Sequence, residues 1–393
     1  MKVDSIAFGG KGVIRDDGKV VFVPDVCTGE TVSFRITRGK KNFAEGELLT
    51  IEKPSPHRVE PKCVHFGSCG GCHLQHMEYE EQLRVKEGFI RDGIERIGKV
   101  ACPEITMTRS AKAWHYRKHI RLNLRKTGQG FFAAYISRNG EPFPVTQCSI
   151  SQHGPLFFEE LQENLRALDN RGIQSGSIRI FIHNELPVLA FSFSPKNPNN
   201  AKEWAEKYQQ VLFRSPVGTL TCGKERLPFS PFGFMQCNEE VSSAIQDEVL
   251  KLAKGHKRIL DLYGGDGTLA TKMIEQGSTV TLVEFNRVLT QIAKKRAIEG
   301  LKVVQSTVEK ADLSSPHDFI YLNPPREGAS KEALLNLLKT DPKEIVYLSC
   351  NPTTLGRDLG YLAKEGYVLS SVKGFDMFPQ TTHIETLVTV KKP

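Results

Sequence analysis

The sequence has no run of about 18 apolar residues, and its N-terminus lacks the apolar core of a signal peptide. It also has no internal repeat and no low-complexity tract. We therefore expect a globular protein of the cytoplasm with no membrane segment. Its 393 residues exceed the length of one average domain, so two or three domains are expected.

Acidic residues are fewer than basic ones: the chain has 45 Asp and Glu and 53 Lys and Arg, which gives a net charge of +8. This excess favours a polyanionic partner such as nucleic acid. In the stretch 114–137, apolar residues alternate with basic and polar ones as in a strand. The apolar side consists of Ile120, Leu122 and Leu124, and the other of Arg117, His119, Arg121, Asn123 and Arg125. The arginines predict a phosphate track; a solvated sheet face is the alternative.

Nine cysteines need an explanation other than disulfides, because the expected compartment is reducing and an odd number cannot pair fully. Cys63, Cys69 and Cys72 have the spacing C-x5-C-x2-C, and Cys148 stands much later. Four thiolates suit either zinc or an iron–sulfur cluster. Three close cysteines with a distant fourth indicate a cluster more than a zinc ribbon, and unliganded structural cysteines are the remaining alternative.

The chain divides into three expected domains within a multidomain α/β protein. Residues 1–56 contain short alternating segments, which predict a small antiparallel barrel of the OB type with a basic strand and loop. Residues 57–230 open with a proline-rich linker and the cysteines, continue with a helical stripe over 79–97, and predict an α+β domain. Residues 231–393 alternate apolar strands with helices, which favours a Rossmann-like, parallel, doubly wound sheet.

A glycine-rich turn, "DLYGGDGTLA" at 261–270, follows one of these strands and opens a helix. Glu284 lies about 20 positions later, where an acid can bind ribose hydroxyls. The pattern Gly264-Gly-Asp-Gly267 is not the dinucleotide fingerprint G-x-G-x-x-G. S-adenosylmethionine is therefore favoured, because it has a ribose and an adenine but no pyrophosphate.

Cys350 ends another apolar strand, at the sheet edge where such folds place their active sites. Glu385 follows in "FPQTTHIE", and "LNPPREG" at 322–328 predicts a rigid turn or a pocket floor. Methylation of pyrimidine C5 needs a thiolate to add at C6, a base to remove the C5 proton, a methyl donor and a pocket for the base. The sequence offers a candidate for each part.

Taken together, the chain resembles the RNA uracil-C5 methyltransferase family, which makes 5-methyluridine in ribosomal or transfer RNA. The resemblance is carried by the four cysteines, "FMQCN", "DLYGGDGT", Glu284, "NPPREG", "LSCNPTTLGRDL" and "FPQTTHIE", and residues 1–56 resemble a TRAM domain. It implies a 4Fe-4S cluster on Cys63, Cys69, Cys72 and Cys148, Cys350 as nucleophile and Glu385 as base. It also implies a monomer acting on RNA, with 23S rRNA as the expected substrate and tRNA as the alternative. The expected donor-site residues are Gln236, Tyr263, Gly265, Thr268, Glu284 and Asn323.

Two positions depart from the family pattern, which commonly has Asp before Pro-Pro and Asn at position 268. This chain has Asn323 and Thr268 there. Our hypothesis is that Asn323 pairs with a uracil edge through its amide donor and carbonyl acceptor. Two rival functions are a base-amine methyltransferase and a non-catalytic RNA-binding protein of the same fold. The first rival would have an aromatic residue where Arg326 stands, and it would leave Cys350 and Glu385 without a role.

Overall fold

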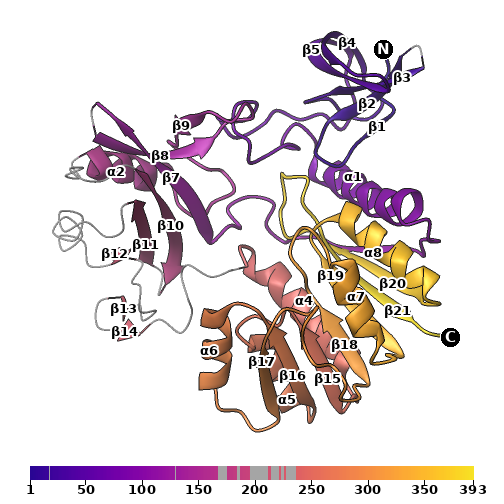
Figure 1. The fold of residues 1–393 in the computed structure, drawn as a ribbon. Coiled ribbons are helices and arrows are strands. Elements are labelled where there is room, and N and C mark those ends of the chain that lie inside the picture. Colours follow the sequence, from indigo (N-terminus) through magenta and orange to yellow (C-terminus); the bar gives the residue numbers. More distant parts are fainter. Residues whose placement is uncertain are drawn as a thin grey trace. The chain divides into compact units, whose positions relative to one another are not determined.

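The computed structural model describes residues 1–16, 18–128, 130–166, 175–183, 186–194, 211–213, 221–222, 225–226 and 236–393 (Figure 1). The chain forms two compact units. The first comprises Met1–Gln82, Lys112–Glu239 and Pro379–Thr382, and the second Leu83–Ala111, Glu240–Phe378 and His383–Pro393. This grouping differs from the expected ranges 1–56, 57–230 and 231–393, because Leu83–Ala111 joins the unit of the C-terminal sheet. Within the described ranges, no helix is both long and apolar enough to cross a membrane.

The first unit begins with a five-stranded sheet in the order β1-β2-β3-β5-β4. The expected strand segments 19–26, 31–37 and 44–53 are present as β3, β4 and β5. Their pairing differs from the antiparallel expectation at one place, because β3 runs parallel to β5. Val21, Val23 and Val32 fill the interior. The strands are β1 (Ser5–Ile6), β2 (Gly12–Asp16), β3 (Lys19–Val23), β4 (Thr31–Gly39) and β5 (Phe43–Lys53).

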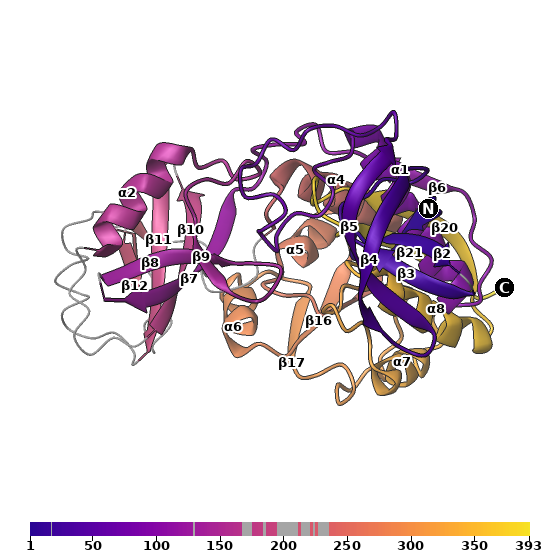
Figure 2. The same ribbon diagram turned by 90° about the horizontal axis from the view of Figure 1, so that it is seen from above.

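A six-stranded sheet in the order β12-β11-β10-β7-β8-β9 follows in the same unit, with α2 (Pro155–Arg166) packed on one face (Figure 2). Its strands are β7 (His119–Thr127), β8 (Gly130–Ile136), β9 (Pro142–Pro144), β10 (Ser175–His183), β11 (Leu186–Ser194) and β12 (Val211–Phe213), and β13 (Thr221–Cys222) with β14 (Glu225–Arg226) forms a separate ribbon. The expected alternation in β7 is confirmed, because Ile120, Leu122 and Leu124 are buried while Arg121 and Arg125 are exposed. Arg117 lies outside the strand, and its Nε donates to the His119 carbonyl (3.0 Å), so the exposed track has two arginines rather than three.

The second unit is built on an eight-stranded sheet in the order β17-β16-β15-β18-β19-β21-β20-β6. Five neighbouring strands, from β17 to β19, are parallel, as expected for a doubly wound sheet. Successive residues of β15 and β18 are buried, which shows that both faces are covered. The strands are β6 (Ile105–Thr108), β15 (Arg258–Leu262), β16 (Thr279–Glu284), β17 (Leu301–Gln305), β18 (Phe319–Leu322), β19 (Glu344–Ser349), β20 (Val368–Phe375) and β21 (Glu385–Lys391).

Helices cover this sheet, and two of them meet at glycines. The helices are α1 (Tyr79–Asp92), a π-helical turn (Gly93–Ile97), α4 (Glu239–Ala253), α5 (Thr268–Glu275), α6 (Arg287–Lys295), α7 (Lys331–Leu338) and α8 (Pro352–Lys364). The predicted stripe over 79–97 is confirmed at Phe89, Ile90 and Ile94, which are buried, but Ile97 is 36% exposed. A Cβ on Gly356 of α8 would collide with the Gly93 carbonyl, so the two backbones are in direct contact. That contact fixes α8, whose N-terminus follows Cys350.

Candidate active site and cysteine pocket

The glycine-rich turn leaves β15 with three residues in the left-handed region: Tyr263 (φ 61°), Gly265 (φ 63°) and Gly267 (φ 78°). Only Tyr263 is strained there, because glycine adopts positive φ freely. Gly264 is required for another reason, since a Cβ would lie 2.6 Å from the Leu282 side chain and 2.7 Å from Oδ2 of Asp261. The backbone therefore folds tightly against β15 and β16 before α5 begins.

Glu284, at the end of β16, holds this turn in place. The Gly265 N–H donates to its Oε2 (3.1 Å), and the Asn286 N–H donates to its Oε1 (2.6 Å). The expected pairing of the glycine turn with an acid about 20 residues later is thus present in the geometry. Two carboxylate oxygens occupied by backbone donors also give Glu284 a fixed orientation at the carboxyl end of the sheet.

Thr268 belongs to a network that stiffens the start of α5. Its hydroxyl donates to Oδ1 of Asp266 (2.8 Å) and accepts from Nη2 of Arg296 (2.8 Å). Arg296 Nε also donates to the Asp266 carbonyl (2.9 Å). The residue that departs from the family pattern is therefore hydrogen-bonded within the protein itself, and no local sequence pattern predicts this network.

Asp261 lies buried beneath the turn and was not expected in the site. Both of its carboxylate oxygens lack a hydrogen-bond partner among the described residues. Burial, and then the charge of Glu284, raises the pKa of Asp261 from 3.8 to about 7. The available signal was an acidic residue inside the apolar strand "RILDL", since such a residue is rarely buried without a reason.

Asn323 follows β18, and its N–H donates to the Leu262 carbonyl (3.3 Å), which places it at the strand end next to the glycine turn. The rigid turn expected after it is present, because the Gly328 N–H donates to the Pro325 carbonyl (2.9 Å). This loop is fastened to the start of α8. Asn351 Nδ2 (3.1 Å) and the Thr354 hydroxyl (3.2 Å) both donate to the carbonyl oxygen of Arg326. These two hydrogen bonds fix the backbone that carries the Arg326 side chain.

Cys350 and Glu385 lie side by side at the end of the sheet. In the antiparallel pair β19 and β21, Ser349 lies opposite Thr386. Cys350 follows Ser349 and Glu385 precedes Thr386, so these two residues are neighbours across the pair. Burial, and then the charge of Glu385, raises the pKa of the Cys350 thiol to about 11. Burial likewise raises the pKa of Glu385 to about 7, and the guanidinium of Arg326 acts against both shifts. The site thus combines a thiol, a carboxyl group and a cation, of which sequence reasoning had missed the cation.

Gln236 is the one expected donor-site residue that belongs to the first unit, whereas the other five belong to the second. Its Oε1 is buried with no hydrogen-bond partner in the described part of the chain. Within the second unit, the structure brings Tyr263, Gly265, Glu284 and Asn323 together at one sheet edge.

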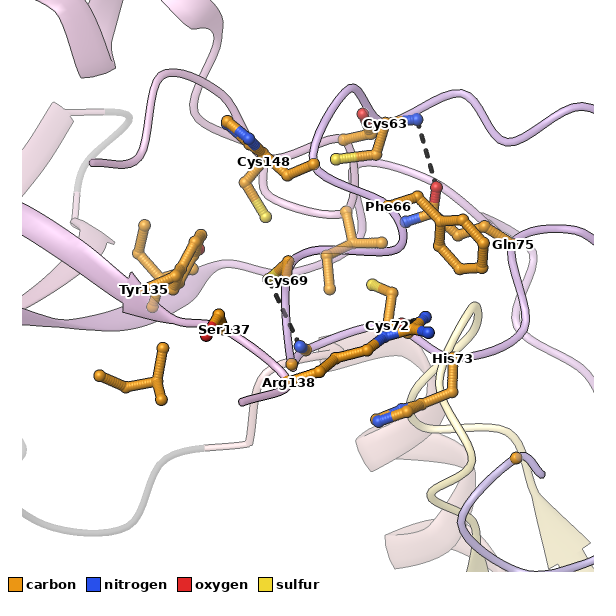
Figure 3. Close-up of a pocket in the computed structure, with 18 of the residues that line it drawn as sticks. Cys63, Phe66, Cys69, Cys72, His73, Gln75, Tyr135, Ser137, Arg138 and Cys148 are labelled. Carbon is orange, nitrogen blue, oxygen red and sulfur yellow. Dashed lines mark hydrogen bonds between the residues drawn. The ribbon is translucent and has the colours of Figure 1, made fainter. Parts of the chain in front are cut away.

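The four expected ligand cysteines line one pocket of the first unit, with a volume of about 600 Å³ (Figure 3). The loop that carries three of them is fastened to the end of β8, because the Gly70 N–H donates to the Ile136 carbonyl (3.0 Å) and the Arg138 N–H to the Ser68 carbonyl (2.9 Å). Arg138 also donates to Oδ2 of Asp25 (2.6 Å). The cysteine loop and the strand that leads towards Cys148 therefore form one packed region.

Neighbouring thiols affect each other in this pocket. Burial, together with charge on Cys148, Cys69 and Cys63, raises the pKa of Cys72 to about 12. The pKa of Cys69 is raised by burial and by its neighbours in the same way. No three Cys, His, Asp or Glu side chains in the described residues are arranged as a metal site. The pocket thus gathers the four sulfur atoms without showing ligand geometry.

Comparison with known proteins adds three findings. A family described as tRNA (uracil-5-)-methyltransferase matches residues 289–393. The chain is 35% identical to an uncharacterized RNA methyltransferase of Protochlamydia amoebophila, over 100% of this chain and 97% of that protein. It is 31% identical to the 23S rRNA (uracil(1939)-C(5))-methyltransferase RlmD of Shewanella halifaxensis, over 98% of this chain and 94% of that protein.

The chain belongs to the RNA uracil-C5 methyltransferase family. Its overall fold matches the crystal structure of the tRNA (uracil-54, C5)-methyltransferase of Pyrococcus abyssi in complex with S-adenosyl-L-homocysteine. The TM-score is 0.73 at 21% identity, over 99% of both chains. The α/β methyltransferase fold expected for the C-terminal sheet is thereby confirmed.

Proposed function

We propose that this protein transfers the methyl group of S-adenosylmethionine to C5 of a uridine in RNA. The observation that carries the proposal is the placement of Cys350 and Glu385 side by side on β19 and β21, with Arg326 acting on both. A base-amine methyltransferase has no use for a thiol in this position. A thiol beside a carboxyl group at the carboxyl end of a parallel sheet is what pyrimidine C5 chemistry requires.

The residues divide the reaction into three steps. The Cys350 sulfur adds to C6 of uracil, and the electron pair moves through C5 to the O4 enolate. S-adenosylmethionine, when bound, supplies an electrophilic methyl group to C5. Glu385 then takes the C5 proton, the C5–C6 double bond re-forms, and the Cys350 thiolate leaves. Arg326 favours the anionic forms of both groups, because a nearby cation lowers the pKa of a thiol and of a carboxyl group.

The donor site fits a cationic nucleoside. The glycine turn lets backbone approach the ligand, and Glu284 stands fixed at the strand end where ribose hydroxyls are bound in related folds. The buried, unpartnered Asp261 favours positive charge above the turn, and the donor carries an ammonium and a sulfonium group. In this proposal Tyr263, Gly265, Thr268 and Asn323 complete the donor and base pocket of the second unit.

The four cysteines would hold a 4Fe-4S cluster. Their gathering in one pocket supports this, and so does the raised pKa of Cys69 and of Cys72, because bound iron would stabilise their thiolates. When bound, the cluster would link the cysteine loop to the segment of Cys148. Carbon methylation needs no electron transfer, so we assign the cluster a structural role.

For the substrate, we favour 23S rRNA, since an RlmD protein is similar to this chain over almost its full length. A tRNA substrate is the second candidate, because the matching family and the solved structure are named for tRNA enzymes. The sheet of residues 5–53 would act as a TRAM-like barrel, and the exposed Arg121 and Arg125 of β7 as a phosphate track. We further propose that the protein works as a monomer in the cytoplasm.

The test replaces the nucleophile. Cys350→Ser should lower methylation of uridine in RNA by at least about 1,000-fold, and it should abolish the stable adduct with 5-fluorouridine RNA. Cys102→Ser, a partly buried cysteine of the same unit, is the matched control and should keep both activities. Full methylation by Cys350→Ser would contradict the proposed chemistry. Mapping 5-methyluridine in 23S rRNA and tRNA, from cells with and without the gene, decides between the two substrates.

A further inference from the structure

The connection between β20 and β21 ends at Glu385. Buried hydrogen bonds and an ion pair attach it to α1. Lys86 and Asp376 form a completely buried ion pair, with Nζ donating to Oδ1 (2.6 Å). The same Nζ donates to the Phe378 carbonyl (2.9 Å). A buried ion pair is costly unless its geometry is well satisfied, and this one fastens the first half of the connection to α1.

Gln380 fastens the second half. It is 2% exposed, and its φ of 70° lies in the left-handed region that residues other than glycine rarely adopt. Its N–H donates to Oε1 of Gln82 (2.9 Å), and Gln82 Nε2 donates back to Oε1 of Gln380 (3.0 Å). Gln82 Nε2 also donates to the Met77 carbonyl (2.9 Å), which fixes the orientation of the amide. We call this reciprocal pair, Gln82 with Gln380, the amide clamp.

The clamp is connected to the cysteine loop through the backbone. The N–H groups of His73 and Leu74 both donate to the Gln380 carbonyl (3.1 Å each), and residue 73 directly follows Cys72. Gln380 Nε2 donates to the Ala113 carbonyl (3.3 Å), and the Tyr116 hydroxyl donates to the Pro379 carbonyl (3.1 Å). A strained backbone persists only where its surroundings over-determine it, and such positions cluster at functional sites.

We propose that the amide clamp positions Glu385 for removal of the C5 proton, five residues further along the chain. This inference rests on the proposed function. Cys350 directly follows β19, whereas Glu385 is the first residue of β21 and directly follows the β20–β21 connection. Loss of the clamp therefore disturbs the base and leaves the nucleophile in place. Gln82 and Gln380 are positioning residues, because neither is placed against the reacting atoms.

The chemistry offers a readout that separates the two steps. With 5-fluorouridine RNA, the thiol adds at C6 and the methyl group is transferred, but C5 then carries fluorine instead of a removable proton, so the adduct stays. With uridine RNA, the adduct disappears as soon as a base removes the proton. A variant with a misplaced base should therefore form the fluorouridine adduct normally and accumulate the uridine adduct.

The experiment compares Gln82→Ala, Gln82→Glu and Gln380→Gly in the full chain with wild type. Gln82→Glu keeps an acceptor for the Gln380 N–H but cannot donate, and Gln380→Gly relieves the strained φ while removing the side chain. Gln276→Ala, an exposed glutamine at the C-terminus of α5, is the matched control. Iron content, circular dichroism and Tm are measured for each variant, so that a folding defect in one is recognised and the others carry the test.

We expect kcat to fall about 10- to 100-fold in the clamp variants with KM for RNA unchanged, which is less than the loss of a whole general base. The uridine adduct should accumulate on denaturing gels, and the fluorouridine adduct should form within twofold of the wild-type rate. Equal slowing of both adducts, or unchanged kcat in folded variants, would overturn the inference. If wild type and Gln276→Ala themselves form no fluorouridine adduct, the proposed function fails and the inference falls with it.

Discussion

Buried cysteines occur in two places in this protein, and their neighbours differ. In the pocket of the first unit, burial raises the pKa of Cys72, and the charged groups that raise it as well are three further thiols, those of Cys148, Cys69 and Cys63. At the sheet edge of the second unit, burial raises the pKa of Cys350 to a similar extent, but the neighbours are a carboxyl group and a guanidinium. Burial alone therefore does not distinguish the proposed cluster ligand from the proposed nucleophile.

The sign and number of neighbouring charges make the distinction. Several thiols together repel each other when ionised, and only a bound cation or cluster stabilises all of them at once. A single thiol beside Arg326 can ionise alone, and the adjoining Glu385 can later accept a proton. The following predictions test this contrast, from the largest expected effect to the smallest.

Glu385→Gln tests the proposed role of the carboxyl group beside Cys350. The amide keeps the shape of the side chain but cannot take the C5 proton, so turnover should fall by about 100- to 10,000-fold. The covalent complex with uridine RNA should accumulate, because addition and methyl transfer do not need this base. Denaturing gels with radiolabelled RNA measure both effects. Glu344→Gln, on the partly exposed first residue of β19, is the control and should turn over normally.

Cys69→Ala tests the proposed structural role of the four-cysteine pocket. We expect loss of iron, and weaker folding or RNA binding before any defect in the chemical step, because the cysteine loop is held to β8 by backbone contacts such as Gly70 to Ile136. A loss of structural metal ligation costs several kcal/mol, on the order of 3 or more, in stability. Iron analysis, Tm and RNA affinity measure it. A soluble variant without iron that methylates RNA like wild type would contradict the structural role.

The pH dependence of adduct breakdown should report Glu385. Its pKa is raised to about 7, so the base becomes protonated as the pH falls through 7, and the single-turnover rate at which the uridine adduct breaks down to methylated RNA should drop about tenfold per pH unit below that value. Cys350, Arg326 and Tyr321 are the charged or titratable groups around it. Because Arg326 lowers the pKa of Glu385, Arg326→Met should move the inflection to higher pH. An inflection near 4.5 in wild type would refute the assignment.

Asp261→Asn should give the smallest effect, on stability. The folded-state pKa of Asp261, about 7, lies above its ordinary 3.8, so its contribution to stability is present at low pH and lost as the pH rises through 7. The substitution removes this loss, and the Tm of the ligand-free protein should rise by about 5 °C at pH 8 and hardly at pH 4. Weaker binding of S-adenosylmethionine should accompany it, which calorimetry measures.

The sequence was sufficient for the local elements and for the placement of the proposed reacting residues at strand ends. Apolar runs located β15, β16, β18 and β19, and the alternation in β7 was correct from residue 120 to residue 125, with Arg117 outside the strand. The glycine turn with Glu284, and the positions of Cys350 and Glu385, were expected and lie together in the second unit. These features depend on local periodicity and on strand ends, which a single sequence displays directly.

Long-range pairing was beyond the sequence. The segment of β6 pairs in parallel with β20, although more than 250 residues separate them, and no local pattern announces such a partner. The helical stripe of α1 indicated an apolar face without indicating which sheet it covers. In the sequence, Arg326 was noted only because it stands where a base-amine methyltransferase would have an aromatic residue. Its effect on the pKa values of Cys350 and Glu385 is seen only in the structure, where the ends of three strands meet.

The inclusion of Leu83–Ala111 in the second unit has a consequence for biosynthesis. The edge of the catalytic sheet is closed by β6, which is made early, against β20, which is made among the last residues of the chain. During translation, the segment Leu83–Ala111 is synthesised long before β20, so its apolar side chains, such as Ile90 and Ile94, stay exposed to solvent until β20 is made. A gene fragment for residues 231–393 would expose the unpaired edge of β20 to other chains, so this enzyme is expected to assemble only as an undivided polypeptide.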